Sequence, residues 1–131
     1  MQLAKQLAVF LENKPGTLAR VTAEFAREKI NILALSISDT VDHSVLRVVV
    51  NDSDKAIHLL ETSGVLVVER DVIVIEGGAR PGDLAKIAQK LAENRINIEY
   101  TYGAVSPGAK KGLLVLRTTD NKKTIKLLNK R

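Results

Sequence analysis

Two Pro-Gly turns are the features of this sequence whose residue types and spacing could bind a ligand. Residues 12–18 read Glu-Asn-Lys-Pro-Gly-Thr-Leu, and residues 78–84 read Gly-Ala-Arg-Pro-Gly-Asp-Leu. Apolar residues at helical spacing follow each turn, so we expect free backbone N–H groups at a helix N-terminus, which favours an anion such as a carboxylate. Gly16 and Gly82 would let a ligand approach the backbone closely. A Pro-Gly pair that only begins a helix is the simpler interpretation of either turn taken alone.

An asparagine follows each of these helical segments, at the start of a predicted strand. Asn31 and Asn97 each stand between two isoleucines. The amide offers one hydrogen-bond acceptor and two donors, which suits an α-amino acid because that ligand presents both a carboxylate and an ammonium group. An asparagine that ends a helix in the left-handed conformation is an equally good interpretation of each position alone.

The two turns belong to an internal repeat. When residues 13–32 are set over residues 79–98, eight of the twenty positions are identical without a gap. Residues 45–47 then match 115–117, and five positions within 52–60 match positions within 120–128. Three matches in the same order indicate a duplication.

Each half of the chain predicts the same order of elements. In the first half we expect strands at 5–11, 31–40, 44–50 and 65–69, with helices after Pro15 and at 53–62. In the second half we expect strands at 72–76, 97–105 and 112–118, with helices after Pro81 and at 121–130. Both prolines are expected at the first helical position, where the missing N–H costs nothing, and Asp52 and Asp120 are expected as N-caps.

The predicted fold class is α+β, with two tandem ferredoxin-like βαββαβ modules at residues 1–70 and 71–131. Each module is an antiparallel sheet with helices on one face. The second module lacks its last strand, so the edge of strand 72–76 is unpaired unless another strand covers it.

One strand differs between the copies in which face is apolar. Leu33, Leu35 and Ile37 are apolar in the first copy, whereas the second has Tyr100 and Tyr102 at the opposite parity. Either a bulge intervenes, or the second strand packs outward in an interface, which we favour.

The composition excludes several kinds of site. The chain has 131 residues, a net charge of +5 and no cysteine, so disulfides and thiolate chemistry are absent. His43 and His58 have no neighbouring nucleophile or metal-ligand spacing, so we expect no enzyme, cofactor or metal. No apolar run approaches the length of about 20 residues that a membrane span needs, and we expect a cytoplasmic protein.

Nucleic-acid binding is a weaker alternative, based on charge. Residues 71–131 contain 12 Lys and Arg against 6 Asp and Glu, including a basic last helix. RNA-recognition modules stack bases on aromatic residues of the central strands, but residues 45–50 and 113–119 contain none.

The ordered pattern of Asn-x-Pro-Gly-x-Leu, an amphipathic helix and Ile-Asn-Ile resembles the ACT domain, twice over nearly the whole chain. Residues 5–7, 10–14 and 46–47 also resemble small stand-alone tandem-ACT proteins of bacteria. The resemblance implies a module that senses an amino acid, bound between the Pro-Gly loop of one module and the Asn-bearing strand of another. The implied site residues are Asn13, Lys14, Pro15, Gly16, Thr17 and Leu18 with Asn97 and Ile98, and reciprocally Arg80, Gly82, Asp83 and Leu84 with Asn31 and Ile32.

The second loop departs from this pattern. Ala79 replaces Asn13, and Asp83 would repel a carboxylate, so we expect one good site in each chain. The resulting hypothesis is a non-enzymatic amino-acid sensor that forms a homodimer and contacts a target enzyme. A regulatory subunit of an amino-acid biosynthetic enzyme and a purely structural dimerisation module are the alternatives.

Overall fold

The computed structural model of the chain describes residues 1–39, 43–77, 80–109 and 111–129. Ala79, Lys130, Arg131 and the first two residues of the hairpin turn expected at 41–43 therefore lie outside the described residues, and the third, His43, is in a strand and not in a turn. The elements follow in the order β1 (Gln2–Glu12), α1 (Thr17–Arg27), β2 (Ile32–Asp39), β3 (His43–Val50), α2 (Ser53–Thr62), β4 (Leu66–Gly77), α3 (Asp83–Glu93), β5 (Ile98–Ala104), β6 (Gly112–Thr118) and α4 (Asn121–Asn129). None of the described helices is long and apolar enough to cross a membrane.

The chain divides into two compact units. The N-terminal unit is Lys5–Arg70, and the C-terminal unit combines Asp71–Arg131 with Met1–Ala4. The units divide between residues 70 and 71, like the predicted modules, but the first four residues belong to the C-terminal unit. Strands β1 and β4 therefore each contribute residues to both units.

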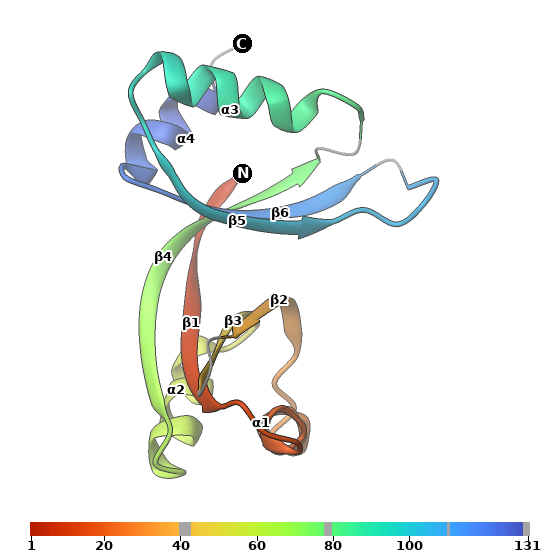
Figure 1. Cartoon of the computed structure of the whole chain (residues 1–131), viewed down its shortest axis with the longest axis vertical. Helices are drawn as coiled ribbons and strands as arrows, with labels where there is room; N and C mark the ends of the chain where they lie inside the picture. The colour runs from red at the N-terminus through yellow and green to blue at the C-terminus, as the bar shows by residue number, and fades with distance from the viewer. Residues whose placement is uncertain (40–42, 78–79, 110, 130–131) are drawn as a thin grey trace. The chain divides into compact units, whose positions relative to one another are not determined.

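In the N-terminal unit the strand order is β2-β3-β1-β4, and β3 is antiparallel to both β1 and β2. Alternate residues of β1 are buried, so Leu7, Val9 and Leu11 pack in one core cluster with Val21 and Phe25 of α1. The helices therefore cover one face of this sheet (Figure 1).

In the C-terminal unit the strand order is β1-β4-β6-β5, with α3 and α4 on the same side of the sheet (Figure 1). No strand of its own follows α4 in the described residues, and the first residues of β1 lie beside β4 instead. The first residues of β1 therefore lie at the edge of β4 for which the sequence offered no partner. The predicted α+β fold of two tandem ferredoxin-like modules is confirmed.

A bulge interrupts the start of the edge strand in each unit. The pairing register shifts between Ile32 and Ala34 in β2, and between Ile98 and Tyr100 in β5. Because the bulges are equivalent, aligned positions of β2 and β5 lie on the same face of their sheets. The copies differ in which of these positions carry the large apolar residues. A bulge was one of the two alternatives considered. The interface that we favoured stays a prediction.

The strand registers correct one part of the sequence repeat. Leu35 lies opposite Val48, and its counterpart Thr101 lies opposite Leu116. Val48 therefore corresponds to Leu116, an offset of 68 residues, whereas the match of 45–47 with 115–117 implied 70. The two-residue error left every side chain on its correct face, because the side-chain period of a strand is two.

The prediction that the prolines occupy the first helical position is wrong, because α1 begins at Thr17 and α3 at Asp83. Gly16 has φ 89° and ψ −13°, and the Thr17 N–H donates to the Lys14 carbonyl at 3.4 Å. Gly82 repeats this geometry with φ 88° and ψ −11°. These values are those of the third residue of a type II turn, in which proline is favoured at the second. Pro-Gly is therefore a turn signal here.

Helices α1 and α3 end in the same strained turn. The Ile30 N–H donates to the Phe25 carbonyl at 2.8 Å, and the Lys29 N–H donates to the Ala26 carbonyl at 3.1 Å. This is a Schellman motif, which needs a left-handed residue at the position after the C-cap. Lys29 supplies it with φ 59°, and Arg95 supplies it in α3 with φ 58°. Glycine is the usual choice, and Gly64 takes the corresponding position after α2 with φ 76°.

We predict that Lys29→Gly and Arg95→Gly each raise the free energy of unfolding by up to about 1 kcal/mol, because glycine removes the left-handed strain at some entropic cost. Urea unfolding followed by circular dichroism measures this change. Lys29→Ala is the matched control, because it removes the cation and keeps the strain. A loss of stability in Lys29→Gly as large as that in Lys29→Ala would show that the charge at the helix C-terminus outweighs the strain.

Candidate functional site

A cavity of about 740 Å³ lies in the N-terminal unit where β1 ends and α1 begins. Three segments of the chain form it: the Pro-Gly turn with its flanks, the start of β3, and the turn between α2 and β4. The lining residues are Phe10, Leu11, Glu12, Lys14, Pro15, Gly16, Thr17, Arg20, His43, Ser63, Gly64, Val65 and Leu66.

Helix α1 begins without a side-chain N-cap. Gly16 occupies the N-cap position and makes no side-chain hydrogen bond. Helices α2 and α4 are different, because Asp52 accepts from the Lys55 N–H at 3.1 Å and Asp120 accepts from the Lys123 N–H at 3.0 Å. The predicted N-caps are therefore confirmed. Helix α1 keeps uncapped N–H groups and the positive end of its dipole beside the cavity.

Thr17, the first residue of α1, has a buried hydroxyl group with no hydrogen-bond partner in the described part of the chain. Its residue is 8% exposed. Its counterpart Asp83 is satisfied, because the carboxylate accepts from the Arg80 N–H at 3.1 Å and lies 3.8 Å from the Arg80 Nε. Since buried polar groups are rarely left unpaired, the Thr17 Oγ1 is the atom at which a ligand would complete the structure.

The cavity carries more positive than negative charge at its rim. Lys14 and Arg20 are cationic, and the one carboxylate among the lining residues, Glu12, lies 2.9 Å from the Lys14 Nζ. The hydrogen bond from Lys14 lowers the pKa of Glu12 below its usual value, and the charges of Lys14, Arg20 and His43 lower it further. Glu12 therefore stays ionised beside Lys14, and the two lining cations outnumber this one carboxylate.

The structure brings together four of the six predicted residues of the first loop, namely Lys14, Pro15, Gly16 and Thr17. Asn13 and Leu18 do not line the cavity, and Leu18 is 37% exposed. Sequence reasoning missed Arg20, although Arg20 and Lys86 are aligned cations in the repeat. It could not find His43 or residues 63–66, because only the tertiary fold brings them to the turn. The described residues contain no group of three or more side chains placed to hold a metal ion.

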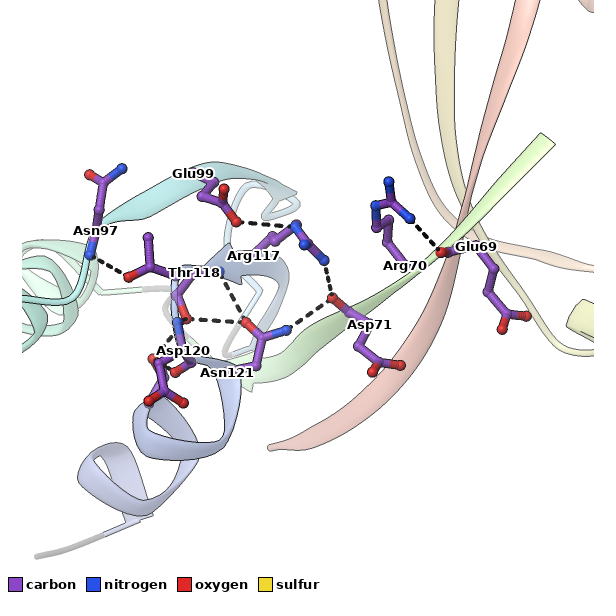
Figure 2. Close-up of polar contacts among 11 residues, drawn as sticks. Glu69, Arg70, Asp71, Asn97, Glu99, Arg117, Thr118, Asp120 and Asn121 are labelled. Atoms are coloured by element: carbon purple, nitrogen blue, oxygen red, sulfur yellow. Dashed lines mark hydrogen bonds and ion pairs between the residues drawn. The ribbon is translucent and has the colours of Figure 1, made fainter. Parts of the chain in front are cut away.

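Asn31 and Asn97 are held by their backbones in the same way. The Asn31 N–H donates to the Asn51 Oδ1 at 2.9 Å, and the Asn97 N–H donates to the Thr119 Oγ1 at 3.1 Å. The side-chain amides take no part in these bonds, both residues are exposed, and Figure 2 shows the Asn97 amide pointing away from its backbone contact. Ile32 and Ile98 beside them pack against the cores.

Arg117 and Asn121 fix the end of the C-terminal sheet that carries Asn97. Arg117 lies 3.2 Å from Glu99 and donates to the Asp71 carbonyl at 3.1 Å (Figure 2). Asn121 donates to the same carbonyl at 2.9 Å and accepts from the Thr118 N–H at 3.0 Å. These bonds join β4, β5, β6 and α4, so they position Asn97 at a defined end of β5.

Within one unit the Pro-Gly turn and the asparagine lie at opposite ends of a helix. Helix α1 has 11 residues and is therefore about 16 Å long. The Pro-Gly turn and the asparagine of one unit are therefore separated by the length of this helix. Of the predicted reciprocal loop, Leu84 lines a different cavity in the C-terminal unit, whereas Arg80, Gly82 and Asp83 do not.

Two ferredoxin-like modules in tandem, each with a Pro-Gly turn before its first helix, make up the chain. The family model described as "ACT domain pair" matches residues 1–131. The chain belongs to the ACT domain pair family.

Relatives of known name or structure resemble the chain to different degrees. A probable acetolactate synthase small subunit from Archaeoglobus fulgidus is 35% identical over 98 residues, and the match covers 63% of this chain and 62% of that protein. Protein BT0572 from Bacteroides thetaiotaomicron is 38% identical with a TM-score of 0.90, covering 96% of this chain and 86% of that one. The regulatory subunit of aspartate kinase from Thermus thermophilus shares the fold at 18% identity, with a TM-score of 0.71 over 98% of this chain and 95% of that one.

We predict that Thr17→Val raises the free energy of unfolding by about 1 kcal/mol, because it removes a buried hydroxyl group that lacks a partner. Thr124→Val is the matched control. Its hydroxyl is buried, donates to the Asp120 carbonyl at 2.8 Å and lies 2.9 Å from the Thr118 Oγ1, so its removal should lower stability by about 1–3 kcal/mol. Chemical denaturation of both variants measures the difference, and a loss of equal size in both would contradict the assignment of Thr17.

Proposed function

We propose that this chain is a non-enzymatic regulatory protein that binds a free amino acid at the turn before α1. The observation that carries the proposal is the Thr17 hydroxyl group, buried and unpartnered at an uncapped helix N-terminus. A ligand carboxylate there would accept from the helix N–H groups and from Thr17, with Arg20 nearby. Membership of the ACT domain pair family supports the same role.

The proposed site is composite. The ligand carboxylate would lie at Lys14, Pro15, Gly16 and Thr17, and the Asn97 amide of a second copy of the chain would bind the ammonium group. The proposal also includes Asn13, Leu18 and Ile98, which neighbour these residues in the sequence. The reciprocal combination of Arg80, Gly82, Asp83 and Leu84 with Asn31 and Ile32 binds more weakly, because Asp83 already satisfies its own turn.

We predict that one amino acid, or a chemically related pair, raises the melting temperature of the wild-type chain. A ligand at 100 times its dissociation constant adds about 2.7 kcal/mol to the free energy of unfolding. Thermal-shift measurements with the twenty amino acids detect this. Thr17→Val should lose most of the shift although its unliganded form is more stable, and Asn97→Ala should weaken it.

Thr22→Val is the control on the same helix, because the Thr22 hydroxyl donates to the Leu18 carbonyl at 2.9 Å. It should keep the full ligand-induced shift. The proposal fails if no amino acid stabilises the chain, or if Thr17→Val responds like the wild type.

The exposed edge strand β2 supports the formation of a homodimer. Leu33, Leu35 and Ile37 are 52%, 48% and 44% exposed, and the described part of the sheet pairs β2 on one side only. A second copy would cover these side chains and the free edge.

We predict that Leu35→Glu shifts the chain from dimer to monomer with little loss of stability, because the side chain is already half in water. Sedimentation velocity measures the change in mass. Thr101→Glu, at the equivalent position of β5, is the control and should leave the dimer intact. A wild-type chain that sediments as a monomer at all concentrations would contradict the prediction.

A second candidate is a regulatory subunit of an amino-acid biosynthetic enzyme. The similarity to the probable acetolactate synthase small subunit favours it, although the chain spans less than two thirds of that protein. Co-elution of the tagged chain with a larger catalytic protein, released or strengthened by the bound amino acid, is the expected result. If the chain elutes alone both with and without the amino acid, this second candidate is contradicted and the stand-alone sensor is supported.

A further inference from the structure

The helix layer of the C-terminal unit, formed by α3 and α4, carries an excess of positive charge. The two helices lie on the same side of their sheet and pack against each other (Figure 1). Against two carboxylates they contain five lysines, namely Lys86, Lys90, Lys122, Lys123 and Lys126. The corresponding helices α1 and α2 contain three Lys and Arg residues and three carboxylates. The duplication therefore provides a neutral copy of the same surface for comparison.

In α3 the second copy has a repulsive pair of charges where the first copy has an attractive one. Arg20 and Glu24 of α1 stand at positions i and i+4, where opposite charges stabilise a helix. The corresponding residues of α3 are Lys86 and Lys90, whose like charges at this spacing destabilise it. Lys86 is exposed and takes part in no ion pair among the described residues. The fold therefore gains no ion pair from this cation.

Helix α4 shows the same kind of exchange, beginning at its N-terminus. Asp54 lies in the first turn of α2, where a carboxylate is favourable beside the positive end of the helix dipole. Its counterpart in α4 is Lys122, followed by Lys123, and the first turn of α4 contains no acidic residue. Lys126, one turn further on, replaces His58 and repels Lys122. All three lysines are exposed, and none forms an ion pair within the described part of the chain.

The stability of the fold does not account for these lysines. The first copy shows that a neutral, partly ion-paired layer serves the same fold, since the Lys55 Nζ of α2 lies 3.9 Å from the Glu28 carboxylate at the end of α1. The second copy instead has like charges within each helix and cations at the N-terminus of α4. An anion outside the chain would relieve this repulsion and supply the missing partners.

The residue types of this surface fit the phosphate groups of a nucleic acid. Protein interfaces are poor in lysine and centre on aromatic residues and arginine, and α3 and α4 contain neither. Stable membrane anchoring needs apolar residues that can insert, but those of α4 pack on the core together with Ile87 and Leu91 of α3. Lysine contacts phosphate as a flexible point charge and needs no aromatic or apolar neighbour.

We propose that the helix layer of the C-terminal unit binds the phosphate backbone of a nucleic-acid duplex through Lys86, Lys122, Lys123 and Lys126. This mode differs from that of RNA-recognition modules, which use aromatic residues of the sheet. It does not depend on base sequence, because phosphate contacts carry no sequence information. The inference goes beyond the proposed function and does not rest on the site at α1.

Fluorescence anisotropy of a short labelled DNA duplex, titrated with the whole chain, tests this surface. We expect binding at about 50 mM salt that weakens roughly 100-fold at about 200 mM salt, because four neutralised phosphates release their counterions. Poly-L-glutamate at an equal concentration of charge should bind more weakly than the duplex, which carries one charge for about every 1.7 Å of its axis. Vesicles that contain phosphatidylserine should also bind more weakly.

Lys126→Glu should weaken duplex binding by roughly fivefold or more and lower the slope of the salt dependence by about one. Arg27→Glu is the matched control, because Arg27 is the cation in the last turn of α1 as Lys126 is in α4, and the change in net charge is the same. It should bind like the wild type. Lys122→Asp restores the residue of the first copy, so it should weaken binding while the melting temperature rises, which excludes unfolding as the cause.

Four results would overturn the inference. The duplex does not bind at low salt, or Arg27→Glu weakens binding as much as Lys126→Glu, which would show that the overall charge of the chain is responsible. Tighter binding of poly-L-glutamate than of the duplex would identify an acidic protein surface as the partner. Tighter binding of the phosphatidylserine vesicles would identify a membrane.

Discussion

The pairing register of the two edge strands governs which side chains the helices meet, and much of the structure depends on it. Each edge strand begins with a one-residue bulge, and each then alternates strictly between faces. A shift of one residue would send every side chain to the other face. Because the bulges are equivalent, Leu35 and Thr101 occupy the same place, and the difference between the units comes from side chains and not from the course of the strand.

The duplication and the order of elements could be predicted because both are local. Pro-Gly spacing, apolar periodicity and the capping aspartates act within a few residues, and Asp52 and Asp120 cap the helices as expected. The prolines were assigned to the wrong position because a type II turn and a helix start share the same dipeptide. The offset of β3 against β6 was wrong by two residues, since a short apolar run fits a strand equally well at either position.

The candidate site was half predictable for a related reason. Lys14 to Thr17 follow one another along the chain, so a motif finds them together. His43 and the turn at residues 63–66 reach the same cavity only after the sheet has formed, and nothing in their local sequence marks them. The sequence could not show that the Thr17 hydroxyl group is buried without a partner, because both properties depend on packing.

The two copies have diverged in opposite directions. The N-terminal copy has an unpartnered hydroxyl group at its Pro-Gly turn, whereas the turn of the C-terminal copy is satisfied by Asp83 and a cavity lies beside α3. A duplication that leaves the fold unchanged allows this, because each copy tolerates the loss of the feature that the other retains.

The order in which the polypeptide is synthesised gives the placement of Met1–Ala4 another meaning. These residues join the C-terminal unit, in which β1 lies beside β4. During synthesis they emerge more than sixty residues before β4, the strand beside which they lie. The rest of β1 can therefore pair with β3 before the first residues of β1 have a partner. The C-terminal unit therefore cannot be completed by its own sequence alone, and a fragment that starts at Asp71 would expose one side of β4 to the solvent.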